Sequence, residues 1–441
     1  MDYKNYIANL IHVDGVSYQE IYDAIALPPN TEMGDYALPC FKFAKALRKS
    51  PVMIAEDLRI SIMADVTLMS DKVISEVSAV NGYLNFKINK DGFVRATLDK
   101  IMSEKDAFGS SAEGAGKTIC IDYSSINIAK PFHIGHLSTT VLGGALYRIF
   151  NFLGYKAVGI NHLGDYGTQF GKLISAYKRW GDKETIEKGG IRALNELYVK
   201  FHQEAEMHPE YDDEARAYFK KIEQGDEECQ ALFHWFKELT LKDVQKIYDM
   251  LDIHFDSYAG ESFYSDKMQP VVDELREKSL LIESRGAQVV DLEEYGMSPC
   301  IILKSDGSSL YATRDMAAAM YRKNTYDFDK CLYVVAYQQN LHFKQFFKVL
   351  ELMGKEWSKD LVHVAYGMVS LEEGTMSTRK GNVVFLEDVI KKCIEKAYTI
   401  LVEKNPDLEN KEDVAQKVGV GAVIFGALYN SKIKDIVFSY D

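Results

Sequence analysis

The 441-residue chain lacks the features that mark membrane and exported proteins. No apolar run approaches the roughly 20 residues that a membrane-spanning helix requires. The first residues, Met1–Tyr6, contain neither the basic segment nor the apolar segment of an export signal. We therefore expect a cytoplasmic protein that has no membrane partner.

The chain also contains few cysteines and fewer basic than acidic residues. The cysteines show no paired spacing and mostly lie in apolar segments; they are Cys40, Cys120, Cys229, Cys300, Cys331 and Cys393. This pattern indicates reduced packing residues and no structural zinc site. The formal net charge of −13 means that a nucleic-acid partner would be bound by local basic patches rather than by the chain as a whole. No internal repeat and no low-complexity segment is present.

Hydrophobic residues make up 47% of the chain, which is enough to bury at least two cores. From about residue 116 to 371, strands such as Thr118–Tyr123, Ala157–Ile160 and Cys331–Ala336 alternate with helices. This alternation predicts an α/β fold with a Rossmann-type parallel sheet, whose site lies at the carboxyl ends of the strands. Charged helices at about 181–255 interrupt it and are predicted to form a helical insertion with a solvated face.

The rest of the chain divides around this predicted domain. A smaller α/β domain precedes it, with a strand at Tyr83–Ile88 and a helix that begins at Ser50-Pro51. Residues 110–116 are a predicted linker. After the sheet come a loop and two amphipathic helices, at about 386–402 and 414–428. The predicted parts are therefore 1–112, 113–371 and 372–441.

A pair of histidines opens the helix that follows the strand Thr118–Tyr123. The motif is His133-Ile134-Gly135-His136, and the helix is predicted to run from about His136 to a stop at Gly154. A strand, a tight polar turn and a helix amino terminus form an anion site, because unpaired N–H groups and the positive end of the helix dipole face the same place. Gly135 leaves room for a flat purine, and both imidazoles can reach one phosphate group. The alternative is a pair of partly buried histidines with ordinary hydrogen-bond partners.

A second motif, Met376-Ser377-Thr378-Arg379-Lys380-Gly381, follows a predicted strand end near Leu371. Gly374 and Gly381 are the predicted hinges of a loop. The hydroxyls and adjacent cations of this loop suit closure over the β- and γ-phosphates of a nucleotide, where cations stabilise a leaving pyrophosphate. The alternative is a solvated basic turn. As a pair, the two motifs predict adenylate chemistry on ATP.

On these motifs the sequence resembles the class I aminoacyl-tRNA synthetases and, among them, the arginyl-tRNA synthetases. The matching segments span nearly the whole chain and are Gly34–Tyr36 with Ala44-Lys45, Ser124–Pro131, Asn161–Gly171, Gly260–Ser262, Tyr311–Asp315, Gln339 with His342, and Met376–Gly381. Three positions depart from the family pattern: Ile126 replaces a proline, Ser138 an arginine and Tyr166 a tryptophan. Thr375 and Thr378 occupy loop positions where many class I synthetases carry lysine. The resemblance implies that Lys130, just ahead of the histidines, compensates.

A pocket for arginine needs a carboxylate held for bidentate pairing, preferably beside a phenol, because a guanidinium is planar, always charged and presents a fork of donors. Tyr311 and Asp315 lie four residues apart, after a hairpin predicted at 301–310, and both can face one cleft. The resemblance implies that Tyr311, Asp315 and Glu261 recognise the arginine side chain. It further implies that Asn127 and Gln339, with Ser125 beside them, hold the α-amino and carboxylate end. From the residues alone, Asp315 is equally an acid in the first turn of a helix, and Glu261 an ordinary loop acid.

The resemblance also implies the contacts of Mg²⁺-bound ATP. Adenine is expected near Gly135 and the backbone of Met368 and Val369, and the ribose near His342. The phosphates are expected to contact Lys130, His133, His136, Met376, Ser377, Thr378, Arg379 and Lys380. The predicted catalytic residues among them are Lys130, His133, His136, Ser377, Thr378 and Arg379. The carboxylate of arginine is already a nucleophile, so positioning and electrostatics supply most of the barrier reduction.

The implied activity is arginine–tRNA ligation by a monomer, with L-arginine, ATP and tRNA(Arg) as substrates. The leading domain is expected to contact the elbow of tRNA, or else to serve stability alone. The last residues resemble the approach to an anticodon-binding domain, so we expect a fragment without that domain. Two rival functions stay open: a small-molecule adenylyl- or nucleotidyl-transferring enzyme of the same superfamily, and a non-catalytic tRNA-binding paralogue, which would be expected to lose the histidines or Lys130.

Overall fold

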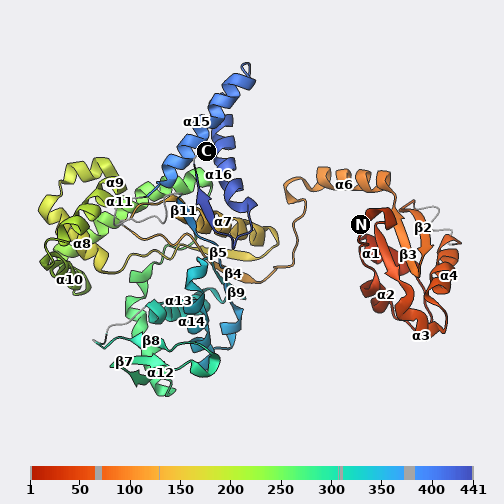
Figure 1. The fold of residues 1–441 in the computed structure, drawn as a ribbon, viewed down its shortest axis with the longest axis horizontal. Helices are drawn as coiled ribbons and strands as arrows, with labels where there is room; N and C mark the ends of the chain where they lie inside the picture. Colours follow the sequence, from red (N-terminus) through yellow and green to blue (C-terminus); the bar gives the residue numbers. More distant parts are fainter. Residues whose placement is uncertain are drawn as a thin grey trace. The chain divides into compact units, whose positions relative to one another are not determined.

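A computed structural model describes residues 2–64, 72–128, 130–305, 307, 311–371 and 383–439. The chain forms two compact units, Met1–Gly109 and Ser110–Asp441 (Figure 1). Each unit has its own hydrophobic core.

The first unit is built on a three-stranded antiparallel sheet of order β1–β3–β2. Strand β3 coincides with the predicted strand, and the predicted helix is α4, which starts at Pro51 and is capped by Ser50, whose Oγ accepts the N–H of Met53 at 3.3 Å. Strands β1 and β2 were not predicted. A register shift between Ile74 and Glu76 breaks the period-two pattern of β2 that would have marked it. The elements are α1 Tyr3–Leu10, α2 Tyr18–Ala24, β1 Tyr36–Pro39, α3 Ala44–Leu47, α4 Pro51–Met63, β2 Ile74–Val80, β3 Tyr83–Ile88 and α6 Lys90–Glu104.

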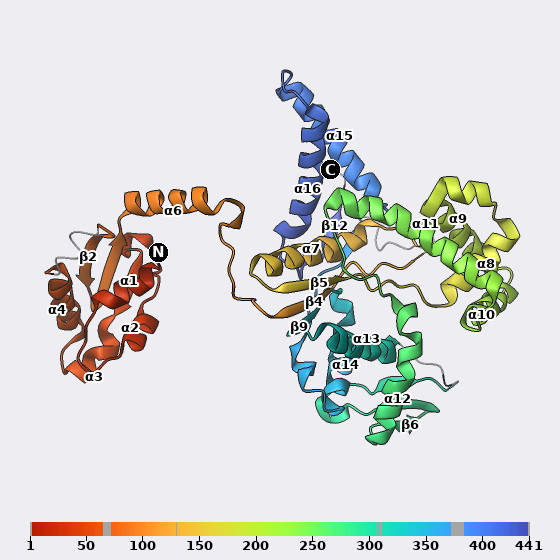
Figure 2. The same ribbon diagram turned by 180° about the vertical axis from the view of Figure 1, so that it is seen from behind.

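The second unit is built on a parallel sheet of order β10–β9–β4–β5, as the alternating pattern predicts. The strands are β4 Thr118–Asp122, β5 Lys156–Ile160, β9 Lys330–Tyr333 and β10 Leu361–His363. Successive residues of β4 serve opposite faces of the sheet: Ile119 and Ile121 pack into one core, and Cys120 into the other. Helix α7 (Leu137–Phe152) covers the first face, and α13 (Tyr311–Tyr326) and α14 (Asn340–Leu352) cover the second, as both views show (Figure 2).

The hairpin predicted at 301–310 includes residues 306 and 308–310, which lie outside the described residues. Strand β8 (Cys300–Leu303) pairs with the preceding strand β7 (Ala287–Val290), which pairs in turn with β6 (Ile282–Ser284). These three strands form a small antiparallel sheet next to α12 (Met268–Glu277) on the α13 side.

The charged region forms helices, as predicted: α9 Lys183–Ala205, α10 Glu210–Glu223 and α11 Glu227–Leu251, reached from α8 Thr168–Trp180. The two amphipathic helices are also present, as α15 Leu386–Lys404 and α16 Lys411–Tyr429. A short strand pair completes the unit, in which β11 (Val369–Leu371) runs parallel to β12 (Ile436–Phe438). The cysteines are unpaired thiols, and Cys120 lies opposite Cys331 on neighbouring strands of the parallel sheet. Within the described ranges, no helix combines the length and the apolar composition needed to cross a membrane.

Candidate active site

Several of the predicted site residues lie where the chain leaves the carboxyl ends of β4, β5 and β9, which is the edge of a parallel sheet at which ligands bind. The tight turn predicted after β4 is wrong, because residues 123–133 separate the strand from the 3-10 turn η4 (Ile134–His136). This long connection carries several of the predicted residues, so the site is assembled from an extended segment and not from one turn.

Strained backbone sets the course of this connection. Ser124 and Ser125 both adopt left-handed conformations, with φ of 66° and 45°, and such positions cost of order 1–3 kcal/mol each unless the surroundings fix them. The surroundings do so here. Ser125 Oγ donates to Asp122 Oδ1 at 2.6 Å, and Arg322, which is 1% exposed, holds Asp122 Oδ2 at 2.7 Å.

A buried network of hydroxyl groups ties the same segment to the histidine motif. Ser124 Oγ lies 2.8 Å from the hydroxyl of Tyr248 on α11 and 2.9 Å from Thr140 Oγ1 on α7. Thr140 Oγ1 also bonds the carbonyl of His136 at 2.7 Å. Networks of this kind rigidify a site when their members are satisfied. Sequence reasoning missed it, since single Ser, Thr and Tyr residues scattered over distant elements carry no shared pattern.

The two histidines have fixed tautomers. His133 Nδ1 accepts the N–H of Gly135 at 3.1 Å, and His136 Nδ1 accepts the N–H of His133 at 3.2 Å. A ring nitrogen that accepts a backbone N–H does not carry the proton, so each neutral ring carries its proton on Nε2. Burial and, to a smaller extent, the charge of Lys130 lower the pKa of His133 to about 4. Burial also holds the pKa of His136 well below its usual value. Near pH 7 both rings are therefore neutral, and each presents one Nε2–H donor.

Asn127 lies where the connections after β4 and β5 run side by side. Ile128 donates its N–H to the carbonyl of Gly164 at 3.1 Å, and Gly164 donates to Ile126 at 2.8 Å. A Cβ at Gly164 would overlap the side chain of Asn127, so glycine is required for this approach. Ile126, which departs from the family's proline, is 1% exposed and packs in the core. Lys130 follows within the same segment, and its charge acts on both His133 and Glu261.

Asp315 is not an acid of a helix's first turn. Helix α13 starts at Tyr311, so Asp315 lies in its second turn, on the same face as Tyr311. His342 Nε2 lies 2.7 Å from Asp315 Oδ2, and the Tyr311 ring meets the His342 ring edge-on at 6.3 Å. Burial alone would raise the pKa of Asp315, but the hydrogen bond from His342 and the charges of His342, His162 and Arg322 together outweigh it, and the pKa is lowered. The second oxygen, Oδ1, is 3.9 Å from His162 Nε2, too far for a hydrogen bond, so it can accept one from a ligand.

Glu261 faces an arginine of the chain itself. Its Oε2 lies 3.2 Å from Arg314 Nη1, and Arg314 also stacks over the Tyr166 ring at 4.5 Å. Burial raises the pKa of Glu261 to about 7, more than the charge of Arg314 lowers it. Tyr166, the departure from tryptophan, additionally bonds Glu223 of α10 through its hydroxyl. Glu261 is thus a partly buried, paired acid and not an ordinary loop residue.

Asp165 fixes the loop that carries Glu261. It is 0% exposed and accepts the N–H and Oγ of Ser262 at 2.8 and 2.7 Å, while Lys237 of α11 reaches its Oδ2 at 2.6 Å. The buried carboxylate therefore joins three segments: the connection after β5, the Gly260–Ser262 loop and the helical insertion. Its place inside the motif Asn161–Gly171 was a usable signal for Asp165. Nothing in the sequence marked Lys237, because it lies within a long charged helix.

Only part of the predicted adenine edge is available for a ligand. Met368 donates its N–H to Asp435 Oδ1 at 2.7 Å, and its carbonyl accepts the N–H of Ile436 at 2.8 Å. In a parallel pair alternate residues face the partner strand, so the N–H and carbonyl of Val369 face away from β12. Asp435 Oδ2 also accepts the hydroxyl of Tyr337, at 3.2 Å, in the 3-10 turn η7 (Tyr337–Gln339) that carries the exposed Gln339. Sequence reasoning missed Asp435 because it lies 67 residues from Met368.

The predicted residues Met376, Ser377, Thr378, Arg379 and Lys380, together with the departure Thr375, lie outside the described residues. Ser138, the third departure, lies in the first turn of α7 and lines a small cavity with Lys432 and Lys434. Within the described part of the chain, no group of three or more His, Cys, Asp or Glu side chains is arranged to hold a metal ion.

Comparisons with known proteins agree with this geometry. Residues 97–440 match the family described as tRNA synthetases class I (R), catalytic domain, and residues 2–88 match the arginyl tRNA synthetase N terminal domain. Among solved structures, the arginyl-tRNA synthetase of Plasmodium falciparum shares 25% identity with a TM-score of 0.71, over 95% of this chain and 72% of its own. That of Thermus thermophilus shares the fold at 22% identity and a TM-score of 0.68, over 94% of this chain and 73% of its own. The parallel sheet and histidine site thus define a class I aminoacyl-tRNA synthetase.

Curated relatives narrow the class. The arginine–tRNA ligase of Clostridioides difficile (strain 630) is 56% identical over 442 residues, which cover all of this chain and 77% of the relative. That of Alkaliphilus metalliredigens (strain QYMF) is 54% identical with the same coverage. The chain belongs to the arginyl-tRNA synthetase family. The predictions of an enzyme and of arginine–tRNA ligation are confirmed, and neither rival function is favoured.

Proposed function

We propose that the chain activates L-arginine with Mg²⁺·ATP and transfers it to the 3′-terminal ribose of tRNA(Arg), using the residues described above in particular roles. Class I synthetases use ATP, and the family acts on arginine and tRNA. The carboxylate of arginine attacks the α-phosphorus and pyrophosphate leaves. A ribose hydroxyl of tRNA then attacks the carbonyl of the adenylate, and AMP leaves.

In this proposal the phosphates lie against the Nε2–H groups of His133 and His136. Because both rings are neutral, they stabilise charge by donating hydrogen bonds, and they require no proton transfer. Lys130 supplies a full positive charge next to them. Ser377, Thr378 and Arg379, with Met376 and Lys380 beside them, keep their predicted role at the leaving pyrophosphate. The Mg²⁺ ion arrives with ATP as part of the substrate.

Adenine is proposed to lie over Gly135 and against the backbone of Val369. Helix start and strand are neighbours, since Val369 packs against the core that contains Ile134. The N–H and carbonyl of Met368 already have partners in the 432–438 segment, which moves the proposed backbone contact from Met368 to Val369. His342 stays the candidate for the ribose, and its bond to Asp315 then connects the ATP and arginine sites.

Asp315 is proposed as the main partner of the guanidinium. Its lowered pKa keeps it ionised, one oxygen is oriented by His342, and the other is 3.9 Å from His162, beyond hydrogen-bond distance. Glu261 is proposed to add a second acid, whose charge depends on pH. Ser125, Asn127 and Gln339 are proposed to hold the α-amino and carboxylate groups. The observation that supports specificity for arginine is an ionised carboxylate that has one oxygen available to a ligand and lies next to a phenol.

Several further assignments belong to the same proposal. The first unit contacts the elbow of tRNA, the chain acts as a monomer in the cytoplasm, and the parts 1–112, 113–371 and 372–441 are its working divisions. The match of residues 2–88 to the N-terminal domain of arginyl tRNA synthetases supports the first of these.

ATP–pyrophosphate exchange, measured for each of the twenty amino acids with and without tRNA, tests the proposal. Exchange should require arginine. Exchange driven by another amino acid would contradict the proposed pocket. A protein that binds ATP and tRNA but exchanges pyrophosphate with no amino acid would instead be a non-catalytic paralogue.

A further inference from the structure

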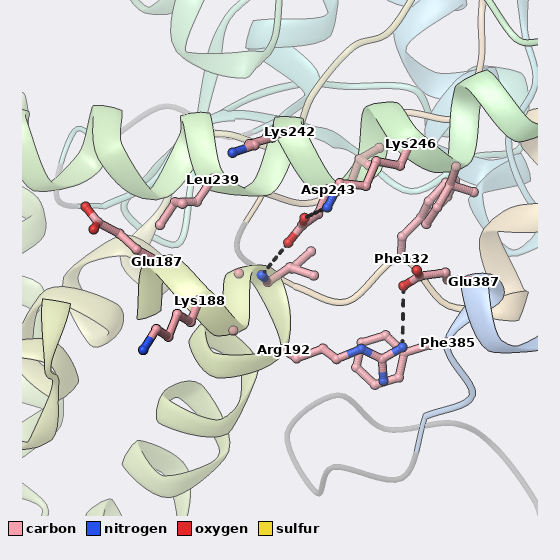
Figure 3. A pocket seen from close by; sticks show the side chains of 15 residues that line it. Phe132, Glu187, Lys188, Arg192, Leu239, Lys242, Asp243, Lys246, Phe385 and Glu387 are labelled. Atoms are coloured by element: carbon pink, nitrogen blue, oxygen red, sulfur yellow. Dashed lines mark hydrogen bonds and ion pairs between the residues drawn. The ribbon is translucent and has the colours of Figure 1, made fainter. Parts of the chain in front are cut away.

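A cavity of about 230 Å³ lies beside the histidine motif, between α9, α11 and the start of α15 (Figure 3). Phe132 and Phe385 line one side, and Lys188, Arg192 and Lys242 approach from the helices. Arg192 is the cation that reaches across to α15 in the figure, where its guanidinium lies over the ring of Phe385.

A kink in α9 places Arg192. Gly190 adopts a left-handed conformation, with φ of 57° inside the helix, and a Cβ there would overlap the carboxylate of Asp243. Asp243 Oδ2 accepts the N–H of Ile191 at 2.8 Å and so caps the second half of the helix from α11. Arg192 therefore projects from a first turn whose direction is fixed from outside the helix.

Arg192 makes three contacts with one short segment. Its guanidinium carbon lies 4.1 Å from the centre of the Phe385 ring, and its Nη2 lies 2.7 Å from Asp388 Oδ1 and 3.5 Å from Glu387 Oε2. Phe385 is the residue before α15, and the two acids lie in the first turn of that helix. A planar guanidinium can stack flat on a ring and, at the same time, bond a carboxylate at its edge.

The same segment is bonded to the histidine motif on both sides of His133. Ile134 donates its N–H to the carbonyl of Val384 at 2.9 Å, and Leu386 donates to the carbonyl of Phe132 at 3.0 Å. His133 and Phe385 are thereby paired residues of a small antiparallel bridge. A shift of Phe385 is consequently passed to the backbone of His133 by two hydrogen bonds.

We infer that Arg192 is a positioning residue for His133, acting through Phe385. It fastens the 384–388 segment to the helical insertion and so holds the Nε2–H of His133 in the direction that the proposed phosphate contact needs. The inference rests on the proposed function only for the phosphate contact of His133. The link from Arg192 to His133 is a property of the protein without substrate.

The first test is made without ligand, on full-length protein labelled with ¹³C in the histidine rings. Arg192→Ala should shift the ring signals of His133, and Arg192→Lys should shift them less, because lysine keeps a charge near Asp388 but loses the planar stack. Lys188→Ala is the matched control, since Lys188 lines the same cavity and its ion pair is with Glu184 on its own helix, at 3.0 Å. Unchanged His133 signals in Arg192→Ala, or equal shifts in Lys188→Ala, would overturn the inference.

The second test is arginine-dependent pyrophosphate exchange. Arg192→Ala should lower kcat on the order of 10-fold, the effect of one cation–π contact and an exposed ion pair, while KM for ATP stays within about 2-fold. The double variant Arg192→Ala with Phe385→Ala should lower kcat little more than either change alone, because both changes remove the same contact. A rise in KM with unchanged kcat, or two fully additive losses, would overturn the inference. A parent without arginine-dependent exchange would count against the proposed function, and the ring signals would still decide the inference.

Discussion

Replacing Asp315 by asparagine removes the charge of the proposed guanidinium partner with little change of shape. In the parent, Oδ2 is bonded by His342 at 2.7 Å and Oδ1 is the oxygen that can accept from arginine. In Asp315→Asn the amide oxygen is drawn to the His342 Nε2–H, so the amide NH₂ is turned toward the substrate. A donor then faces the donors of the guanidinium, and no acceptor is left in this position.

The size of the effect follows from what is lost. A hydrogen bond to a charged group contributes about 1.5–3 kcal/mol, and the side chain is 25% exposed, which favours the middle of that range. We expect arginine to bind on the order of 10²-fold more weakly, with ATP affinity unchanged. Isothermal titration calorimetry with each ligand measures both quantities.

The matched control is Asp327→Asn, which removes the same charge just beyond the end of α13, where the side chain is 89% exposed and paired with Lys323. This variant should bind arginine as the parent does. Citrulline, which keeps the shape of arginine without its charge, should not bind the parent detectably. Arginine binding by Asp315→Asn at the parental affinity would refute the assignment and leave Glu261 as the principal acid.

Three further predictions concern Glu261, Lys130 and Gly190. Because burial raises the pKa of Glu261 to about 7, its negative charge is present above that pH and lost below it, so arginine affinity should rise between about pH 6 and 8. Titration calorimetry should show this rise in the parent and no pH dependence of affinity in Glu261→Gln, and a parent whose affinity does not change with pH would contradict the contact. Lys130→Ala should lower the single-turnover rate of adenylate formation on the order of 10²-fold with ATP affinity nearly unchanged, whereas weaker ATP binding at an unchanged rate would assign Lys130 to ground-state binding. Gly190→Ala should lower Tm by several degrees more than Gly225→Ala. An alanine at positive φ costs about 1–2 kcal/mol at either position, but of the two only Gly190 also has a carboxylate in the space of the added Cβ. Equal losses of Tm in thermal unfolding would show that the Asp243 side chain moves aside at no cost.

Local patterns in the sequence were sufficient to predict those helices and strands that carry such a pattern. The parallel strands are apolar runs between helical periods, and the capped helix α4 begins with Ser50-Pro51, so both are readable over a few residues. Strand β2 was missed because its bulge breaks the alternation, and β12 because three residues in a polar tail resemble a loop. The same limit applied to the turn after β4, whose course is fixed by Asp122 and Arg322 from different segments.

The site shows a similar division. Motif spacing singled out the histidines, and the family resemblance singled out Asp315 and Asn127, but neither could show which of their atoms are already engaged. The tautomers of His133 and His136 depend on backbone N–H groups, and the raised pKa of Glu261 depends on burial. Arg192 and Lys237 were missed because each acts from an ordinary charged helix, and only the fold brings it to a partner.

The pairing of β11 with β12 also has a consequence for the order in which the protein is made. About 65 residues separate the two strands along the chain, and synthesis at roughly 5–20 residues per second takes about 3–13 s to cover them. During that time the parallel sheet and the histidine motif have already been synthesised, while Met368 still lacks Asp435 and Ile436 as partners. The side of the site proposed for adenine is therefore completed after the histidine motif, and a nascent chain that stops before Asp435 has the histidines without the strand that pairs with β11.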